Sequence, residues 1–163
     1  MAKSAPAPPP RFDGFADRDG RFFRALARNQ RREWFAMHKE EYDEGWLTPM
    51  KALLAEMRTR LEPLYSHDPL AEPKIFRIHR DVRFSKDKSP YKTHIGGYLA
   101  IGGTGHGPSA AAALYVHVGG DELFVAAGVG GGASRGGLHA EGERGELPRQ
   151  ANVLPRLLEQ ARA

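Results

Sequence analysis

The apolar residues of this chain change their spacing once, between Pro63 and Pro69, and this change constrains the fold most strongly. Before Pro63 they recur every three or four residues, as they do along one face of a helix. After Pro69 many of them alternate with polar residues, as in a strand with one buried face. Helices followed by strands with short connections indicate an α+β fold. We therefore expect N-terminal helices packed on a largely antiparallel sheet.

Three helical segments are expected in the first part of the chain. The first ends near Asn29, and Asp17 or Asp19 can cap its start. The third is expected to start with Thr48 as its N-cap and Pro49 in the first helical position, where proline loses no hydrogen bond. The apolar faces of the second and third helices comprise Trp34, Phe35, His38 and Tyr42, and Met50, Leu53, Leu54, Met57 and Leu61, respectively.

Four strands are expected in the second part. Residues 74–85 alternate between a mostly apolar face and a charged face, which predicts the first strand. The second is expected at residues 92–101, the third at 110–118 and the fourth at 123–129. Gly119-Gly120-Asp121 predicts a hairpin turn between the last two.

The composition divides the chain into three parts. Residues 1–11 are rich in alanine and proline, and we expect a disordered leader. Residues 12–129 carry the periodic patterns and are predicted to form a single α+β domain. Residues 130–163 are rich in glycine and have little apolar periodicity, so we expect a mostly disordered tail.

Several classes of protein are disfavoured by composition. The chain has no cysteine, which excludes disulfides and thiolate chemistry. It has no apolar run of about 20 residues that could cross a membrane, and we expect a cytoplasmic protein. The net charge of +4 is small for a dedicated nucleic-acid-binding protein. Neither a P-loop nor a GxSxG sequence is present. The sequence identifies no cofactor and no reaction.

The most promising site is the stretch KIFRIHRDVRFSKDKSPYKTHIGGY, residues 74–98, because few structural strands carry so many ionisable groups. Arginine offers a planar set of donors that suits phosphate or carboxylate. We predict that this stretch binds an anionic, phosphate-bearing small molecule. The predicted ligand-binding residues are Arg77, Arg80, Asp81, Arg83, Asp87, Lys88 and Tyr91, and Lys92 is a further candidate.

Three other interpretations of this stretch remain open. The protein could be a structural or partner-binding protein, in which the arginines and aspartates form a network that holds the loop at residues 85–91 against the sheet. The lysines could contact the phosphates of a nucleic acid. His79, His94 and His117 could meet across adjacent strands and hold a metal ion with Asp81, although isolated histidines are more often structural.

The motif RIHRDVRFSKDKSPY resembles the signature RxxRDxRFxxDKxxY of a widespread bacterial family, the domain of unknown function (DUF) 2461. The matching residues are Arg77, Arg80, Asp81, Arg83, Phe84, Asp87, Lys88 and Tyr91. The upstream sequence NQRREWFAMHKEEYDEGWLTPMKALL is also similar to the helical region of that family. The resemblance covers roughly residues 12–129, and it implies no activity, because the family has none assigned.

The end of the chain departs from the family pattern. Members continue beyond the strand that ends near Val129 with further helical sequence, whereas a glycine- and arginine-rich sequence follows here. We therefore expect a frameshift or a truncated gene model, and a domain that lacks part of its core.

Overall fold

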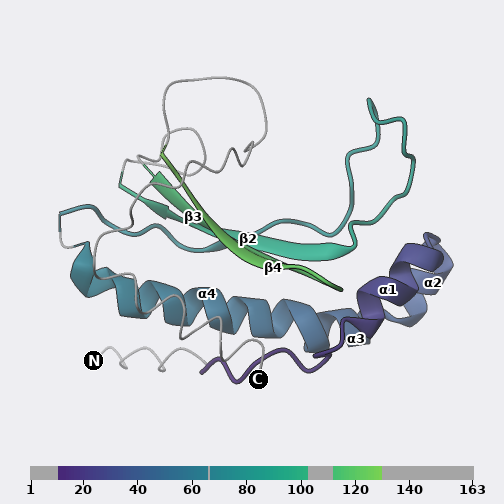
Figure 1. Cartoon of the computed structure of the whole chain (residues 1–163), viewed down its shortest axis with the longest axis horizontal. Coiled ribbons are helices and arrows are strands. Elements are labelled where there is room, and N and C mark those ends of the chain that lie inside the picture. The colour runs from purple at the N-terminus through teal and green to yellow at the C-terminus, as the bar shows by residue number, and fades with distance from the viewer. Residues whose placement is uncertain (1–10, 66, 103–111, 130–163) are drawn as a thin grey trace, which may run out of the picture.

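The computed structural model describes residues 11–65, 67–102 and 112–129, and it shows helices followed by an antiparallel sheet (Figure 1). The helical elements are α1 (Arg21–Arg28), α2 (Arg32–Met37), α3 (Lys39–Tyr42), the π-helical turn η1 (Asp43–Leu47), α4 (Thr48–Leu61) and the 3₁₀ turn η2 (Glu62–Leu64). The strands are β1 (Lys74–Ile75), β2 (His94–Ile101), β3 (Ala112–Gly119) and β4 (Leu123–Val129). The α+β class is confirmed. The expected leader, except Arg11, and the whole expected tail lie outside the described residues.

The start of α1 is capped from a distance by Asp17. Its carboxylate accepts hydrogen bonds from the backbone N–H groups of Arg21 and Phe22, at 3.0 and 2.7 Å. These two donors have no partner within the helix, so the carboxylate satisfies them and complements the positive end of the helix. Gly20, in the left-handed conformation at φ 63°, turns the chain between the cap and the helix. Of the two predicted caps, the structure uses Asp17.

The predicted start of the third helix at Thr48-Pro49 is confirmed, because α4 begins at Thr48 and has Pro49 in its first turn, but the predicted N-cap role of Thr48 is wrong. Thr48 has helical backbone angles, φ −64° and ψ −48°, and α4 continues directly from η1. The N–H of Thr48 donates to the carbonyl of Asp43, five residues earlier, which is the spacing of a π-helical turn. Pro49 explains the wider turn, because its ring has no N–H and would collide with the carbonyl four residues before it.

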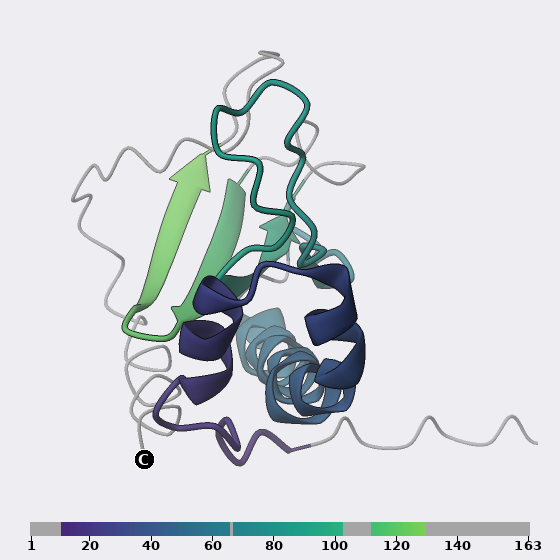
Figure 2. The ribbon, with the colours of Figure 1, turned by 90° about the vertical axis from the view of Figure 1, so that its right-hand side faces the viewer.

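The sheet is an antiparallel meander in the order β1-β2-β3-β4. Paired residues share a face, and the pair Ile95–Val118 and the pair Gly97–Val116 lie on the face that covers α4. Figure 2 shows the helices gathered on that one side of the sheet. The core between the two layers contains the buried stripe predicted for the third helix: Met50, Leu53, Leu54, Met57 and Leu61.

The predicted first strand is wrong beyond Ile75. Only Lys74–Ile75 pairs as a strand with β2. Residues 76–93, which we call the arm, leave the sheet and return to it as a long projecting loop (Figure 1). The alternation of apolar and charged residues persists in the arm, but Phe84 at its outer end is 95% exposed. No described helix of the structure is both long and apolar enough to span a membrane.

Candidate functional site

The arm joins the sheet through a bulge. Its inner part stays antiparallel to the returning chain: Phe76 N–H donates to the carbonyl of Gly96, and Lys92 N–H donates to that of Ile78, both at 2.8 Å. Between these two bonds the outgoing side has one residue, Arg77, whereas the returning side has three, residues 93–95. A bulge of this kind bends the strand and redirects its side chains. It brings the beginning of β2 under the base of the arm.

The outer end of the arm binds mainly to itself. The guanidinium of Arg83 donates two hydrogen bonds to the carboxylate of Asp81, at 3.0 and 2.7 Å. This guanidinium lowers the pKa of Asp81 to about 2. Lys88 Nζ donates to the carbonyl of Val82 at 2.9 Å. The Lys88 bond occupies a backbone carbonyl that a regular strand would offer to a neighbouring strand.

A cavity of about 320 Å³ lies at the base of the arm, and we call it the arm cavity. It is lined by Ala27, Gln30, Arg80, Asp87, Ser89, Tyr91, Lys92, Thr93 and His94. Its walls thus come from the end of α1 and from Gln30 just after it, from both sides of the arm, and from the start of β2. Segments more than 60 residues apart in the sequence meet there.

Tyr91 and Gln30 fasten the arm to the helices. The ring of Tyr91 is buried at 4% exposure and stacks on Phe35, with ring centroids 4.5 Å apart. The backbone N–H of Tyr91 donates to Gln30 Oε1 at 3.0 Å. With its oxygen held by this bond, the side-chain NH₂ group of Gln30 keeps both of its donors for other partners. Tyr91 therefore acts as an anchor, and Gln30 both holds the arm and lines the cavity.

Two cations and one carboxylate line the arm cavity. Arg80 forms an ion pair with Asp87, which also accepts hydrogen bonds from the backbone and hydroxyl of Ser89 at 2.9 and 2.6 Å. The Ser89 bonds and the Arg80 guanidinium hold the pKa of Asp87 well below its usual range. Lys92 is partly buried, and burial and the charge of Arg77 lower its pKa. Burial therefore destabilises the Lys92 ammonium, whose Nζ donates a hydrogen bond to the carbonyl of Arg77 at 3.0 Å.

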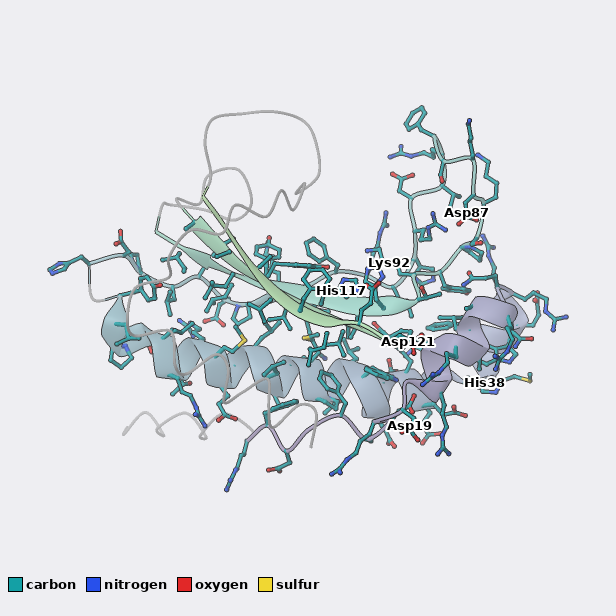
Figure 3. All side chains as sticks on the ribbon, viewed as in Figure 1. Asp19, His38, Asp87, Lys92, His117 and Asp121 are labelled. Atoms are coloured by element: carbon teal, nitrogen blue, oxygen red, sulfur yellow. The ribbon has the colours of Figure 1, made fainter. Side chains whose placement is uncertain are left out.

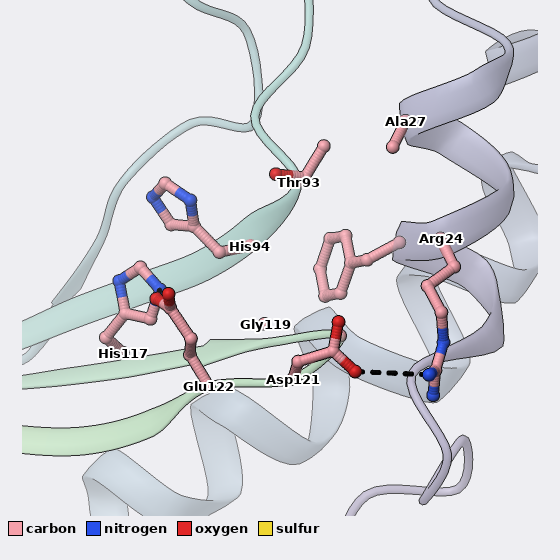
Figure 4. A pocket seen from close by; sticks show the side chains of 10 residues that line it. Arg24, Ala27, Thr93, His94, His117, Gly119, Asp121 and Glu122 are labelled. Carbon is pink, nitrogen blue, oxygen red and sulfur yellow. Dashed lines mark hydrogen bonds and ion pairs between the residues drawn. The ribbon is translucent and has the colours of Figure 1, made fainter.

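A second cavity of about 230 Å³ adjoins the first, and we call it the hairpin cavity (Figure 4). It is lined by Phe23, Arg24, Ala27, Thr93, His94, His117, Gly119, Gly120, Asp121 and Glu122. Ala27, Thr93 and His94 border both cavities. Arg24 of α1 forms an ion pair with Asp121 of the hairpin at 3.1 Å and closes one side. Gly20 permits this approach, since a Cβ there would lie 2.5 Å from the backbone of Gly120.

His94, which lines both cavities, stacks on His117, which lines the hairpin cavity, with ring centroids 4.1 Å apart. Burial, together with His117, Lys92 and Arg80, lowers the pKa of His94 to about 4. Burial also lowers the pKa of His117, although Glu122, at 3.4 Å from its Nε2, opposes this effect. Both rings are therefore neutral at pH 7. A neutral imidazole can donate one hydrogen bond and accept another.

The structure separates the predicted ligand-binding residues into two groups. Those that line the arm cavity are Arg80, Asp87 and Tyr91. Those that line neither cavity are Arg77, Asp81, Arg83 and Lys88. Their role in binding stays a prediction.

The meeting of three histidines, one of the interpretations left open by the sequence, is only partly found. His79 packs against Phe35 and Tyr91, away from His94 and His117. Among the described residues there is no group of three side chains that could hold a metal ion.

The wall residues that the motif did not indicate come mainly from the helices and the hairpin. Gln30 and Arg24 stand at ordinary polar positions of the sequence, and nothing local distinguishes them. The positions of His94 and His117 on the sheet could be predicted from the sequence. Gly96, two residues after His94 and on the same face, pairs with His117. The alternation of β2 and β3 thus indicated that both histidines lie away from the core.

Fold and site together define a small α+β protein with a charged arm and two joined cavities at its base. A family described as a conserved hypothetical protein (DUF2461) matches residues 20–134, which is more than half of the chain. The chain belongs to this family. No curated protein and no solved structure matches it.

Proposed function

We propose that the protein binds a phosphate-bearing small molecule in the arm cavity. The observation that carries this proposal is the position of Lys92, a partly buried cation that lines a cavity with Arg80. An anion beside the two groups offsets the cost of burying the ammonium. It also accepts charge-assisted hydrogen bonds, which are roughly twice as strong as neutral ones.

Neutral donors complete the set that a phosphate requires. The hydroxyl of Thr93, the amide of Gln30 and the imidazole of His94 line the same cavity. A phosphate monoester presents three acceptor oxygens, so it can use donors from several directions at once. A carboxylate presents only two. This convergence of charged and neutral donors favours phosphate over a simple carboxylate.

Isothermal titration of the full chain with inorganic phosphate tests the proposal. We expect binding to the wild type and about tenfold weaker binding to Lys92→Gln, because hydrogen bonds to charged groups contribute about 1.5–3 kcal/mol. The matched control is Lys86→Gln, which removes the same charge from an exposed position of the arm that lines neither cavity. Equal losses in the two variants, or no heat of binding to the wild type, would contradict the proposal.

A second candidate function is nucleic-acid binding through the outer end of the arm. The favouring observation is that Arg83, Lys86 and Lys88 are exposed around Phe84, which is itself 95% exposed. Cations beside an exposed ring suit a phosphate backbone and a base. Binding of this kind weakens steeply as salt rises from about 50 to about 200 mM, whereas one phosphate in a cavity loses less affinity. A salt titration with a single-stranded oligonucleotide therefore separates the two candidates.

A further inference from the structure

The face of the sheet that points away from α4 carries a patch of aromatic side chains. We call Phe76, Tyr98, Tyr115 and Phe124 the outer aromatic patch. Tyr98 pairs with Tyr115 across β2 and β3, so the two rings stand on the same face, opposite to the buried neighbour Leu99. Phe76, Tyr98 and Tyr115 are half-buried, and Phe124 is 39% exposed. Rings of this kind on a strand surface offer flat faces for stacking.

The patch is continuous with the proposed phosphate site. Lys92 Nζ lies over the ring of Phe76, 5.5 Å from its centroid. Phe76 in turn lies 5.4 Å from Tyr98 and 6.0 Å from Tyr115, between ring centroids. Figure 3 shows Lys92 and His117 together on the side of the sheet away from α4, with Asp87 further out along the arm. The same lysine thus borders both the arm cavity and the aromatic patch.

At the centre of the outer aromatic patch, the absence of a side chain at Gly96 leaves space for the ring of Tyr115. Gly96 pairs with His117 and lies next to Tyr115. A Cβ at Gly96 would stand 2.6 Å from the hydroxyl oxygen of Tyr115. The missing side chain lets the Tyr115 ring lie across β2, where its hydroxyl reaches Nδ1 of His117 at 3.1 Å. The Tyr115 ring is therefore held in place by this hydrogen bond.

The charge beside the patch indicates what it binds. The helices of the described structure lie on the opposite side of the sheet (Figure 2). The arm at the edge of the patch carries six lysines and arginines and two aspartates. A ligand that is apolar and aromatic at one end and anionic at the other matches this pairing of surfaces.

We propose that the ligand of the arm cavity is a nucleotide, whose phosphate binds beside Lys92 and Arg80 while its base stacks on Phe76 and Tyr98. This inference rests on the proposed phosphate site and adds the chemical class of the rest of the ligand. Stacking on aromatic side chains tolerates every base, because each base has a π-face. The geometry therefore selects for an aromatic ring next to a phosphate and not for one particular base.

Titrations of the full chain with adenosine monophosphate, ribose 5-phosphate and inorganic phosphate at one ionic strength test the inference. We expect adenosine monophosphate to bind about tenfold more tightly than ribose 5-phosphate, from the stacking of one base. Tyr98→Leu should abolish this difference and leave ribose 5-phosphate binding unchanged. Phe84→Leu is the matched control, since it removes an aromatic ring from the exposed end of the arm. It should change neither affinity.

Ring-current shifts in the wild-type protein give a second readout that does not depend on a variant. The adenine protons of adenosine monophosphate should move upfield on binding if the base stacks on a ring. Equal affinities for the three ligands, or unshifted adenine protons in the bound state, would contradict the proposal that the ligand is a nucleotide. They would not contradict the proposed phosphate site. Binding of none of them would remove both proposals. Tighter binding of a single-stranded oligonucleotide, with a steep dependence on salt, would indicate that the ligand is a nucleic acid and not a free nucleotide.

Discussion

The imidazole rings of His94 and His117 lie nearly parallel across β2 and β3, with an angle of 26° between their planes. Both rings line the hairpin cavity, His94 also lines the arm cavity, and both rings have lowered pKa values. A proton on one ring would repel a proton on the other and would lie near the charges of Lys92 and Arg80. The folded structure therefore favours two neutral histidines at its site.

This relationship predicts that acid weakens the fold. The pKa of His94 is about 4 in the folded protein, against a usual value of 6.5, so the unfolded chain binds more protons between these two pH values. The free energy of unfolding should fall as pH drops from about 6.5 to about 4. We expect a loss on the order of 1–2 kcal/mol, less than the full shift because His94 is only half-buried.

Urea unfolding at neutral pH and at a pH just above the folded-state pKa of His94 measures this loss, and His94→Asn supplies the control. Asparagine keeps a polar side chain at the position but cannot take up a proton, so the variant should lose less stability than the wild type between the two pH values. The same loss in both proteins would show that other groups cause the pH dependence.

Asp87 is predicted to restrain phosphate binding. Its carboxylate pairs with Arg80 inside the arm cavity and competes with an incoming anion for that guanidinium. Asp87→Asn should therefore bind inorganic phosphate severalfold more tightly than the wild type. Stability should change little, because exposed ion pairs contribute little. Titration calorimetry of the variant measures the affinity.

Asp81→Asn is the control for this prediction. Asp81 pairs with Arg83 at the outer end of the arm and lines neither cavity. The substitution removes the same charge without freeing a cation of the cavity. An equal gain in affinity from Asp81→Asn would mean that the overall charge of the arm, and not the Arg80 pair, sets the affinity.

Gln30 is predicted to serve both stability and binding. Gln30→Ala removes the acceptor of the Tyr91 backbone N–H, and an unpaired, partly buried donor costs about 1–2 kcal/mol. Gln30→Glu keeps an acceptor at this place but brings a negative charge to the cavity. We expect near wild-type stability and weaker phosphate binding from Gln30→Glu, measured by thermal unfolding and calorimetry. Unchanged phosphate binding to Gln30→Glu would place the anion elsewhere.

The contact between α4 and the sheet depends on Gly97. A Cβ at this position would lie 2.6 Å from Leu54 Cδ1 and 2.9 Å from the backbone oxygen of Lys74. Because the backbone cannot move away easily, Gly97→Ala should destabilise the fold by about 1–3 kcal/mol. Gly128→Ala is a matched strand control, since a Cβ there would meet no atom of the described residues within 4 Å. Denaturant unfolding that ranks the two variants equally would contradict this packing.

The sequence was sufficient to predict those elements whose structure depends only on the local spacing of apolar residues and on turn residues. The apolar stripe that ends at Leu61 predicted the buried face of α4, because a helix must bury that face somewhere. Alternation and the turn Gly119-Gly120-Asp121 likewise predicted β3 and β4 as a hairpin. In each case local spacing and burial agree.

The arm shows why the rest could not be predicted. Its alternation is that of a strand, but a strand also needs a neighbouring strand, and beyond Phe76 the outgoing half of the arm forms its backbone hydrogen bonds with its own returning half. The bulge at residues 93–95 and the bonds of Lys88 and Lys92 to backbone carbonyls depend on this folding back. The cavity likewise needs Gln30, which is distant in sequence and carries no local signal.

The most direct test of the central claim is to map where inorganic phosphate binds, by following the backbone amide signals of the full chain during a titration. We predict that the largest shift changes fall on Lys92, Thr93 and His94, at the base of the arm. Residues 83–88 at its outer end should change little. Changes concentrated at that outer end, or spread evenly over the chain, would contradict a phosphate site in the arm cavity.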